Sequence, residues 1–414
     1  MTELLDVISI MSRSSTMISI KPTVFFWLLD KSGYSIPEIA DKIEYEETEI
    51  LKWKDVRDTI KLPLSKVEII SKIIERPLSA FFMAEPPKDH KLPKDFRKLP
   101  TTSQGESLTY SKETLLAFRK ASHLQEVATE LLNNINKPLG FEVPKYTLLD
   151  NPEDIAEIER EKSGVSIDLQ INLENATNAY GVWRECLATY GIFVFEFNMP
   201  LEDARGFCLI ETDQKIVVVS KKDALRGRIF SLLHEYAHVL LRESVICNID
   251  SDSSSNINIV KIENWCNQFA GAFLLPKAEI IKEYSDFTAR NENILKFLQK
   301  LSDKYKISRE SVLVRLRFLN LVDFSYYSRI KSIIESEIRE RKIKEREERD
   351  ALKAKGIEPS FMPQKPKDKT IWNDRGANFV SLVLQNSNKG YITERDVMDI
   401  LELRVDHLMK LLPS

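Results

Sequence analysis

Residues 230–241 read FSLLHEYAHVLL, an HExxH sequence inside a strongly apolar run. In a helix, residues four apart lie on one face about one turn apart, so His234 and His238 would direct ring nitrogens at one ion. Glu235 follows the first histidine and would take a proton from a water bound to that ion, which makes it the candidate general base. The run therefore predicts a buried helix that carries a Zn2+ site.

The alternative interpretation is that HExxH arises by chance, which we estimate for roughly one chain in a hundred of this length. Both histidines would then only pack or face solvent. In an apolar helix, however, two unliganded imidazoles and a carboxylate would cost about a few kcal/mol in lost solvation. A metal ion supplies the partner that they need, so we favour ligation.

A catalytic zinc site uses three protein ligands and leaves a fourth position for water, so a further His, Asp or Glu is required. Glu263 begins a predicted helix whose following face is apolar, which would hold its carboxylate near the core. Asp250 and Asp252 are the alternatives, but in their polar loop a solvated or capping role is the ordinary expectation. The remaining histidines lie in distant segments: His90, His123 and His407.

Two segments resemble the ImmA/IrrE family of metallo-endopeptidases: FSLLHEYAH, residues 230–238, and ENWCNQFAGAFLLP, residues 263–276. The resemblance implies zinc ligands at His234, His238 and Glu263 and a catalytic Glu235. Ala237 and Cys266 stand where the family usually has Gly and Ala, and Ser220 where many members have Asn. Other matching positions are interpreted as structural: Asn267, Phe269, Ala270 and Pro276.

The resemblance also implies a partner, because the family cleaves a specific regulatory protein, typically a helix-turn-helix transcriptional repressor. Members occur in mobile-element and toxin-antitoxin settings, and the sequence does not select among these.

The composition is that of a globular protein, with 414 residues, 43% hydrophobic and 30% charged. No stretch approaches the roughly 20 apolar residues of a membrane span, and residues 1–22 do not read as a secretory signal. The four cysteines show no CxxC spacing. We therefore expect a cytoplasmic protein without a membrane role.

The expected fold class is α+β and predominantly helical: an all-α helix-turn-helix bundle, a zincin-like peptidase with a small sheet, and a C-terminal helical region. The predicted limits are 1–82 for the helix-turn-helix domain, 83–110 for a proline-rich connector, 111–320 for the peptidase, 321–370 for a charged helix and linker, and 371–414 for a helical tail.

One region predicts a sheet, because three short runs are rich in Val, Ile and Phe. They are residues 191–197, 206–211 and 215–220, and residues 212–214 form a predicted hairpin turn. An edge of this sheet is a candidate place for a substrate bound as an added strand.

The competing hypothesis is a DNA-binding transcriptional regulator, or a toxin-antitoxin component, in which the metal site is regulatory or structural. Its support is the order helix, turn, helix over residues 35–53. Yet residues 22–82 hold nine Lys or Arg against eleven Asp or Glu, a balance that does not attract phosphates. The candidate backbone contacts are Lys52, Lys54 and Arg57, and a protein-docking role remains open. A third hypothesis is a partner-binding scaffold whose site is closed by residues 76–100 or by the C-terminal tail.

Overall fold

The computed structural model describes residues 16–74, 76–86, 110–136, 142–210, 212–242, 253–354 and 367–410. They fall into two compact units. Unit 1 comprises residues 1–91 and 103–119, and unit 2 comprises residues 92–102 and 120–414. Across the described ranges, no helix is both long enough and apolar enough to cross a membrane.

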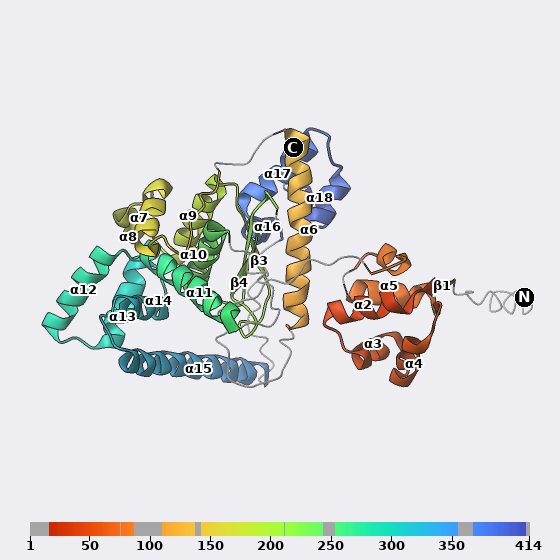
Figure 1. Ribbon diagram of the computed structural model, residues 1–414, viewed down its shortest axis with the longest axis horizontal. Coiled ribbons are helices and arrows are strands. Elements are labelled where there is room, and N and C mark those ends of the chain that lie inside the picture. Colours follow the sequence, from red (N-terminus) through yellow and green to blue (C-terminus); the bar gives the residue numbers. More distant parts are fainter. Residues whose placement is uncertain are drawn as a thin grey trace, which may run out of the picture. The chain divides into compact units, whose positions relative to one another are not determined.

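Unit 1 is a small helical domain with its own core (Figure 1). Its elements are β1 (Met17–Ile20), α2 (Pro22–Ser32), α3 (Ile36–Ile43), α4 (Glu47–Lys52), η1 (Trp53–Asp55), β2 (Ile60–Pro63), α5 (Leu64–Ile73), η2 (Leu78–Phe82) and the first residues of α6 (Lys112–Ile135). The expectation of an all-α domain needs correction, because β1 pairs antiparallel with β2. Each strand has only four residues, and alternating Ile and Leu side chains bury one face of the ribbon.

The segment expected to form a helix-turn-helix contains α3 and α4. Ser35 and Glu38 form a capping box that fixes the start of α3, and Glu44 ends it in the left-handed backbone region with φ of 57°. Ile39, Ile43 and Ile50 are buried, so the two helices are held by their apolar positions. The acidic residues of α4 stay exposed.

Unit 2 contains a three-stranded sheet and most of the helices (Figure 1). The elements up to the second long buried helix are α7 (Pro152–Ser163), α8 (Ile167–Asn172), α9 (Ala176–Thr189), β3 (Phe193–Phe197), β4 (Gly206–Leu209), β5 (Ile216–Ser220), α10 (Leu225–Leu241) and α11 (Ser253–Leu274). The remainder are α12 (Lys277–Arg290), α13 (Ile294–Tyr305), α14 (Arg309–Phe318), α15 (Phe324–Ala354), α16 (Lys367–Arg375), α17 (Ala377–Asn388), α18 (Glu394–Leu401) and α19 (Val405–Leu408). The predominantly helical α+β class is thereby confirmed.

The sheet has the strand order β3-β5-β4. β5 pairs parallel with β3 and antiparallel with β4, as the predicted hairpin requires. Every residue of β3 and β5 is buried, which shows that both faces of the sheet are covered. Val194, Val217 and Val219 pack in one core with residues of α10, so α10 covers one face.

The C-terminal helices cover the opposite face. The Phe379 ring of α17 makes edge contacts with the Phe193 and Phe195 rings of β3, at centroid distances of 5.3 and 5.1 Å. Asn378 donates a hydrogen bond to the backbone oxygen of Ile192, and Arg184 donates one to that of Asn373. Residues 367–410 are therefore packed into the same unit as the sheet that supports α10.

The packing of the Phe379 ring against β3 predicts the effect of removing that ring. Phe379→Ala would leave a cavity against β3 and lower the free energy of unfolding by about 3–5 kcal/mol. Met409→Ala is the control, because the Met409 side chain is 67% exposed and truncating it should change stability by under about 0.5 kcal/mol. Urea unfolding followed by circular dichroism measures both, and equal stability of the two variants would contradict the packing role.

Candidate metal centre

The candidate metal centre lies where α10 packs against α11. α10 is buried along almost its whole length, including His234, Glu235 and His238. α11 brings Glu263 to the same place, and its next two turns bury Cys266, Phe269 and Phe273. Because both helices are fixed by apolar packing over several turns, the polar side chains that they carry have little freedom to move apart.

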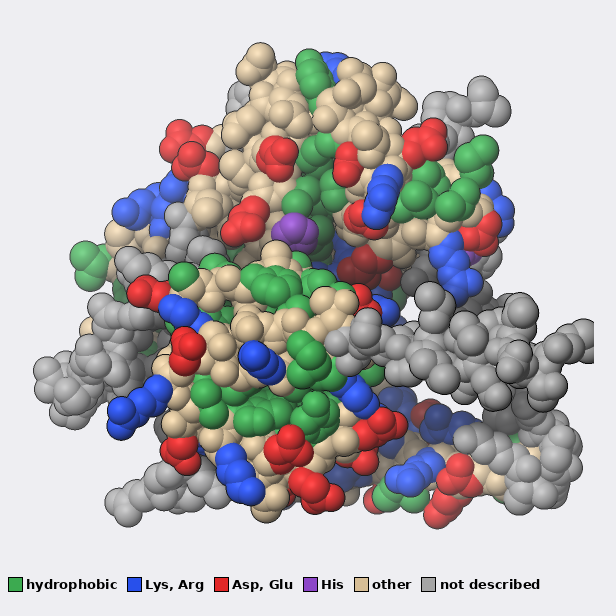
Figure 2. Space-filling model, turned by 90° about the vertical axis from the view of Figure 1, so that its right-hand side faces the viewer, with side chains coloured by type: hydrophobic (Ala, Val, Ile, Leu, Met, Phe, Trp, Pro, Cys, Tyr) green, Lys and Arg blue, Asp and Glu red, His purple; other side chains and the backbone are tan. Residues whose placement is uncertain are grey.

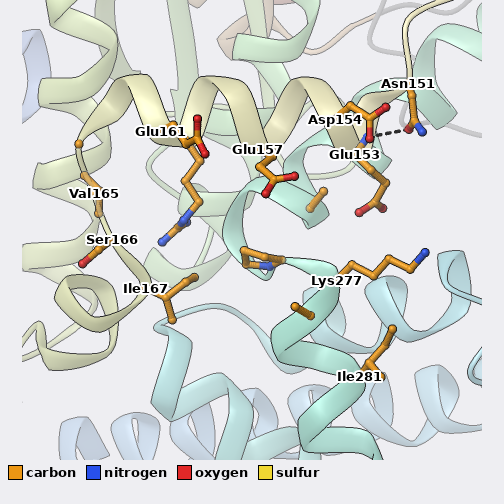
Figure 3. A pocket seen from close by; sticks show the side chains of 15 residues that line it. Asn151, Glu153, Asp154, Glu157, Glu161, Val165, Ser166, Ile167, Lys277 and Ile281 are labelled. Carbon is orange, nitrogen blue, oxygen red and sulfur yellow. Dashed lines mark hydrogen bonds between the residues drawn. The ribbon is translucent and has the colours of Figure 1, made fainter.

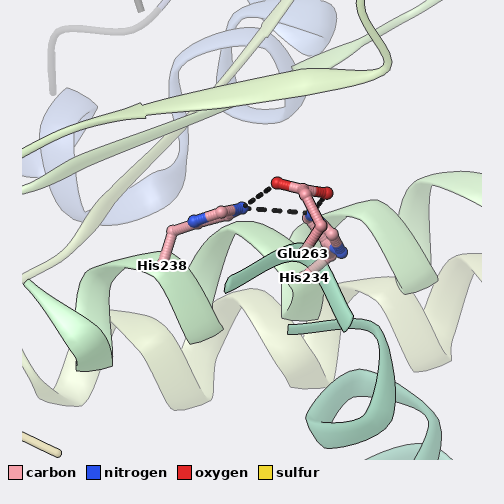
Figure 4. Close-up of side chains that lie close together, drawn as sticks. All are labelled: His234, His238 and Glu263. Atoms are coloured by element: carbon pink, nitrogen blue, oxygen red, sulfur yellow. Dashed lines mark hydrogen bonds and ion pairs between the residues drawn. The ribbon is translucent and has the colours of Figure 1, made fainter. Parts of the chain in front are cut away.

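Three ligand-type side chains converge at this point (Figure 4). The Nε2 atoms of His234 and His238 are 3.2 Å apart. The two carboxylate oxygens of Glu263 lie 3.3 Å from His234 Nε2 and 3.1 Å from His238 Nε2. All three residues are buried, so the cluster is screened from water.

These separations fit a metal ion. Tetrahedral zinc with bonds of about 2.0–2.2 Å places neighbouring ligand atoms about 3.3–3.6 Å apart. Two neutral imidazoles with facing nitrogen lone pairs repel each other at 3.2 Å unless a cation or a proton lies between them. Moreover, neither carboxylate oxygen of Glu263 accepts a hydrogen bond from the described residues. His234, His238 and Glu263 could therefore hold a metal ion together.

The electrostatics of the cluster agree with this arrangement. Burial alone would raise the pKa of the Glu263 carboxyl, but the imidazoles of His234 and His238 hold that pKa well below its usual range. Burial would likewise lower the pKa of His238, whereas its neighbours Cys266 and Glu263 raise that pKa. The site thus favours a carboxylate anion facing positive charge, which a divalent cation supplies.

A further residue orients the first histidine. His234 Nδ1 lies 3.0 Å from the side-chain oxygen of Asn267. Because an amide oxygen only accepts, Nδ1 carries the proton and the Nε2 lone pair faces the cluster. Asn267 is therefore more than the structural position expected from the sequence. Its spacing of four residues from Glu263 on a helix puts both side chains on one face.

The opposite side of α10 is held by a buried carboxylate. Glu159 of α7 accepts hydrogen bonds from the hydroxyl groups of Tyr236, at 2.8 Å, and Tyr190, at 3.0 Å. Tyr146 and Lys162 donate to its other oxygen at 2.7 and 2.8 Å. Burial opposes ionisation, but these donors lower the pKa of Glu159. Since Tyr236 lies within the HExxH sequence, the network fixes the rotation of the helix.

Residues 187–317, from the end of α9 through most of α14, match the sequence pattern of peptidase M78, described as an IrrE N-terminal-like domain. This segment is similar to the IrrE N-terminal-like domain. The match confirms the resemblance to the ImmA/IrrE family for this part of the chain, and it spans the strands and both helices of the metal centre. It does not extend to residues 1–186 or 318–414.

Two other comparisons add little to the IrrE-like assignment. No curated protein matches the chain. Among solved structures, a Mycobacterium tuberculosis transcriptional regulator is similar at 20% identity with a TM-score of 0.28. That likeness covers 47% of this chain and 51% of the other, about half of its length. At this TM-score it carries no information on activity.

The residues considered for DNA binding lie in unit 1 and are not part of the metal centre. Lys52, Lys54 and Arg57 are exposed, and Lys54 lies over the Phe26 ring at 5.3 Å. Glu47 and Glu49 of α4 are exposed beside them. Among the described residues visible in Figure 2, Lys and Arg side chains are interspersed with Asp and Glu side chains. The alternative ligands, Asp250 and Asp252, fall outside the described residues.

A cavity of about 910 Å³ lies elsewhere, between α7 and the start of α12 (Figure 3). Its wall includes Glu153 and Arg160, but both are already engaged. Glu153 pairs with the buried Arg315, and Arg160 donates hydrogen bonds to the backbone oxygen of Phe273 and to Gln170. None of the metal-centre residues lines this cavity, so the chemistry suggested by HExxH does not reside there.

The ligand assignment predicts how zinc content responds to substitution. His234→Ala should lose most of one zinc per chain, and Asn267→Ala should weaken zinc binding about 10- to 100-fold. His123→Ala is the control, because His123 is exposed and belongs to α6. Elemental analysis after dialysis against a graded chelator measures all three, and stoichiometric zinc in His234→Ala would contradict the assignment.

The Glu159 network predicts a pH dependence of stability. A carboxyl whose pKa is lowered in the folded state contributes stability above the unfolded pKa, about 4.3, and loses it as the pH falls through the folded pKa. Glu159→Gln should therefore cost about 2 kcal/mol near pH 7 and progressively less below about pH 4.5. Urea unfolding between pH 3 and pH 8 measures this. A cost that does not change with pH would show that the charge of Glu159 is not what the tyrosines stabilise.

Proposed function

We propose that the chain is a zinc-dependent endopeptidase whose ligands are His234, His238 and Glu263. The observation that carries the proposal is the buried convergence of two imidazole nitrogens and one carboxylate, with separations of 3.1 to 3.3 Å. Histidine and carboxylate ligands are the set that catalytic zinc uses when a fourth position serves water or substrate. The IrrE-like match at residues 187–317 supports the same reading, because this family is a peptidase family.

Glu235 is the proposed general base. It is adjacent to the first ligand on α10 and only 4% exposed, so it is sheltered from solvent as the three ligands are. Zinc, when bound, supplies a Lewis acid that polarises the scissile carbonyl and acidifies water. Glu235 would take the proton of the attacking water and later deliver it to the nitrogen of the leaving amine. Amide hydrolysis then balances as one peptide bond broken and one water consumed.

The substrate is proposed to be a protein and, as the family resemblance implies, a transcriptional repressor. β4 runs beside Glu235, since a Cβ atom on Gly206 would lie 3.1 Å from the Cγ atom of that side chain. A substrate segment that followed β4 would therefore bring its backbone past the metal centre.

A regulator that binds DNA through unit 1 is the second candidate, favoured only by the order of α3 and α4. The exposed acidic residues of α4 count against it, since phosphate contacts supply most of the affinity of such domains. A toxin-antitoxin role is compatible with either candidate.

The test compares new protein N-termini in host cells that express the wild-type chain or Glu235→Gln. Glu235→Gln keeps the size of the side chain and both histidines, so it should bind zinc but lose about 100-fold or more of the activity. We expect new termini only with the wild type, under resting or stress conditions. Termini that are identical in both cultures, with zinc bound in both proteins, would reject the endopeptidase in favour of a regulator or scaffold.

A further inference from the structure

We propose that Gly206 is a positioning residue, which sets where the Glu235 carboxylate can lie by leaving space for it. The inference rests on the proposed function, in which Glu235 is the general base. Gly206 is the first residue of β4 and is buried. It pairs in register with Val219, whose side chain packs with the core on the α10 face of the sheet. Position 206 therefore faces the helix that carries Glu235.

The available space is too small for a side chain. A Cβ atom at residue 206 would lie 3.1 Å from both Cγ and Oε1 of Glu235, and 2.7 Å from the backbone oxygen of Val218. Distances of this kind are shorter than ordinary carbon contacts of about 3.5–4.0 Å, so atoms on one side must move. The backbone conformation of Gly206 does not itself require glycine, because its φ angle is not positive. The requirement for glycine comes from Glu235 and β5.

The Glu235 side chain cannot move away from an added methyl group without displacing its carboxylate. Its backbone lies in the middle of α10, between the two histidines, and both neighbouring turns are buried. The carboxylate would therefore swing about its own side-chain bonds. The contacts at 3.1 Å require the carboxylate to give way by a few tenths of an ångström. A general base must reach the proton that it takes within about 2.6–3.2 Å, and rates are sensitive to such shifts, since a full displacement of about 1 Å can cost about 100-fold. Glycine at 206 thus serves the reaction through Glu235, by the space that it leaves for the carboxylate.

The prediction concerns Gly206→Ala in two backgrounds, the wild-type chain and Glu235→Ala. If Gly206 makes room for Glu235, the alanine should lower the folding equilibrium constant at least about tenfold more in the wild type than in Glu235→Ala. The remaining penalty, shared by both backgrounds, comes from the contact with Val218. Gly181→Ala is the matched control, because no atom lies within 4 Å of the added methyl group, and its effect should be equal in both backgrounds.

Urea unfolding of the full chain measures these constants without any substrate. Equal penalties for Gly206→Ala in the two backgrounds would overturn the proposal. Should Gly206→Ala alone fail to fold, the cycle is repeated in a stabilising osmolyte, where a larger penalty in the wild type supports the proposal and equal penalties overturn it.

A second measurement uses a peptide that spans the cleavage site found in host cells. Gly206→Ala should lower kcat about 10- to 100-fold, with KM and one zinc per chain unchanged. Wild-type kcat in that variant would overturn the positioning role. If the wild type itself cleaves nothing, the proposed function fails, while the unfolding cycle still decides whether Gly206 places Glu235.

Discussion

The convergence of His234, His238 and Glu263 is the constraint on which the rest of unit 2 depends. Three buried groups with lone pairs directed at one point are unfavourable without a cation, so the surrounding packing must keep them there. The apolar faces of α10 and α11 do this directly. α10 is held in turn by the sheet on one side and by the hydroxyl groups around Glu159 on the other. The metal centre is therefore a product of the whole unit rather than of one motif.

Three ion pairs, each with one buried partner, extend this support. Arg315 of α14 pairs with Glu153 of α7 and also donates to the backbone oxygen of Leu275, at the end of α11. Glu196 of β3 is paired with Arg184 of α9 and Arg228 of α10. Each of the buried charged side chains is shielded from water while an oppositely charged partner and further hydrogen bonds compensate it. Other arrangements of the helices would leave the charge without its partner, so they are disfavoured. α10 and α11 are thus fixed at their ends as well as along their lengths.

Much of the fold could be predicted because it follows from local patterns. The apolar periodicity of α10, the Val- and Ile-rich strands and the HExxH spacing are all visible within about 20 residues. α7 escaped prediction because its sequence is highly charged, and its buried Glu159 and Arg160 have partners, such as Tyr236 and Phe273, far along the chain. The contact of Phe379 with β3 is equally long-range. In the metal centre, the placement of His234 and His238 on one face could be predicted, because they are one helical turn apart. The approach of Glu263 and the hydrogen bond of Asn267 depend on how α10 packs against α11, which the sequence does not show.

The most direct test of the three zinc ligands is X-ray absorption at the zinc edge of the purified full chain. We expect only nitrogen and oxygen neighbours of the zinc ion, at about 2.0–2.2 Å, from two histidines, one carboxylate and one solvent oxygen. Cys266 borders His238 but is not among the converging ligands, so no sulfur should be present. A zinc–sulfur distance of about 2.3 Å, or a shell without histidine scattering, would contradict the assignment of His234, His238 and Glu263.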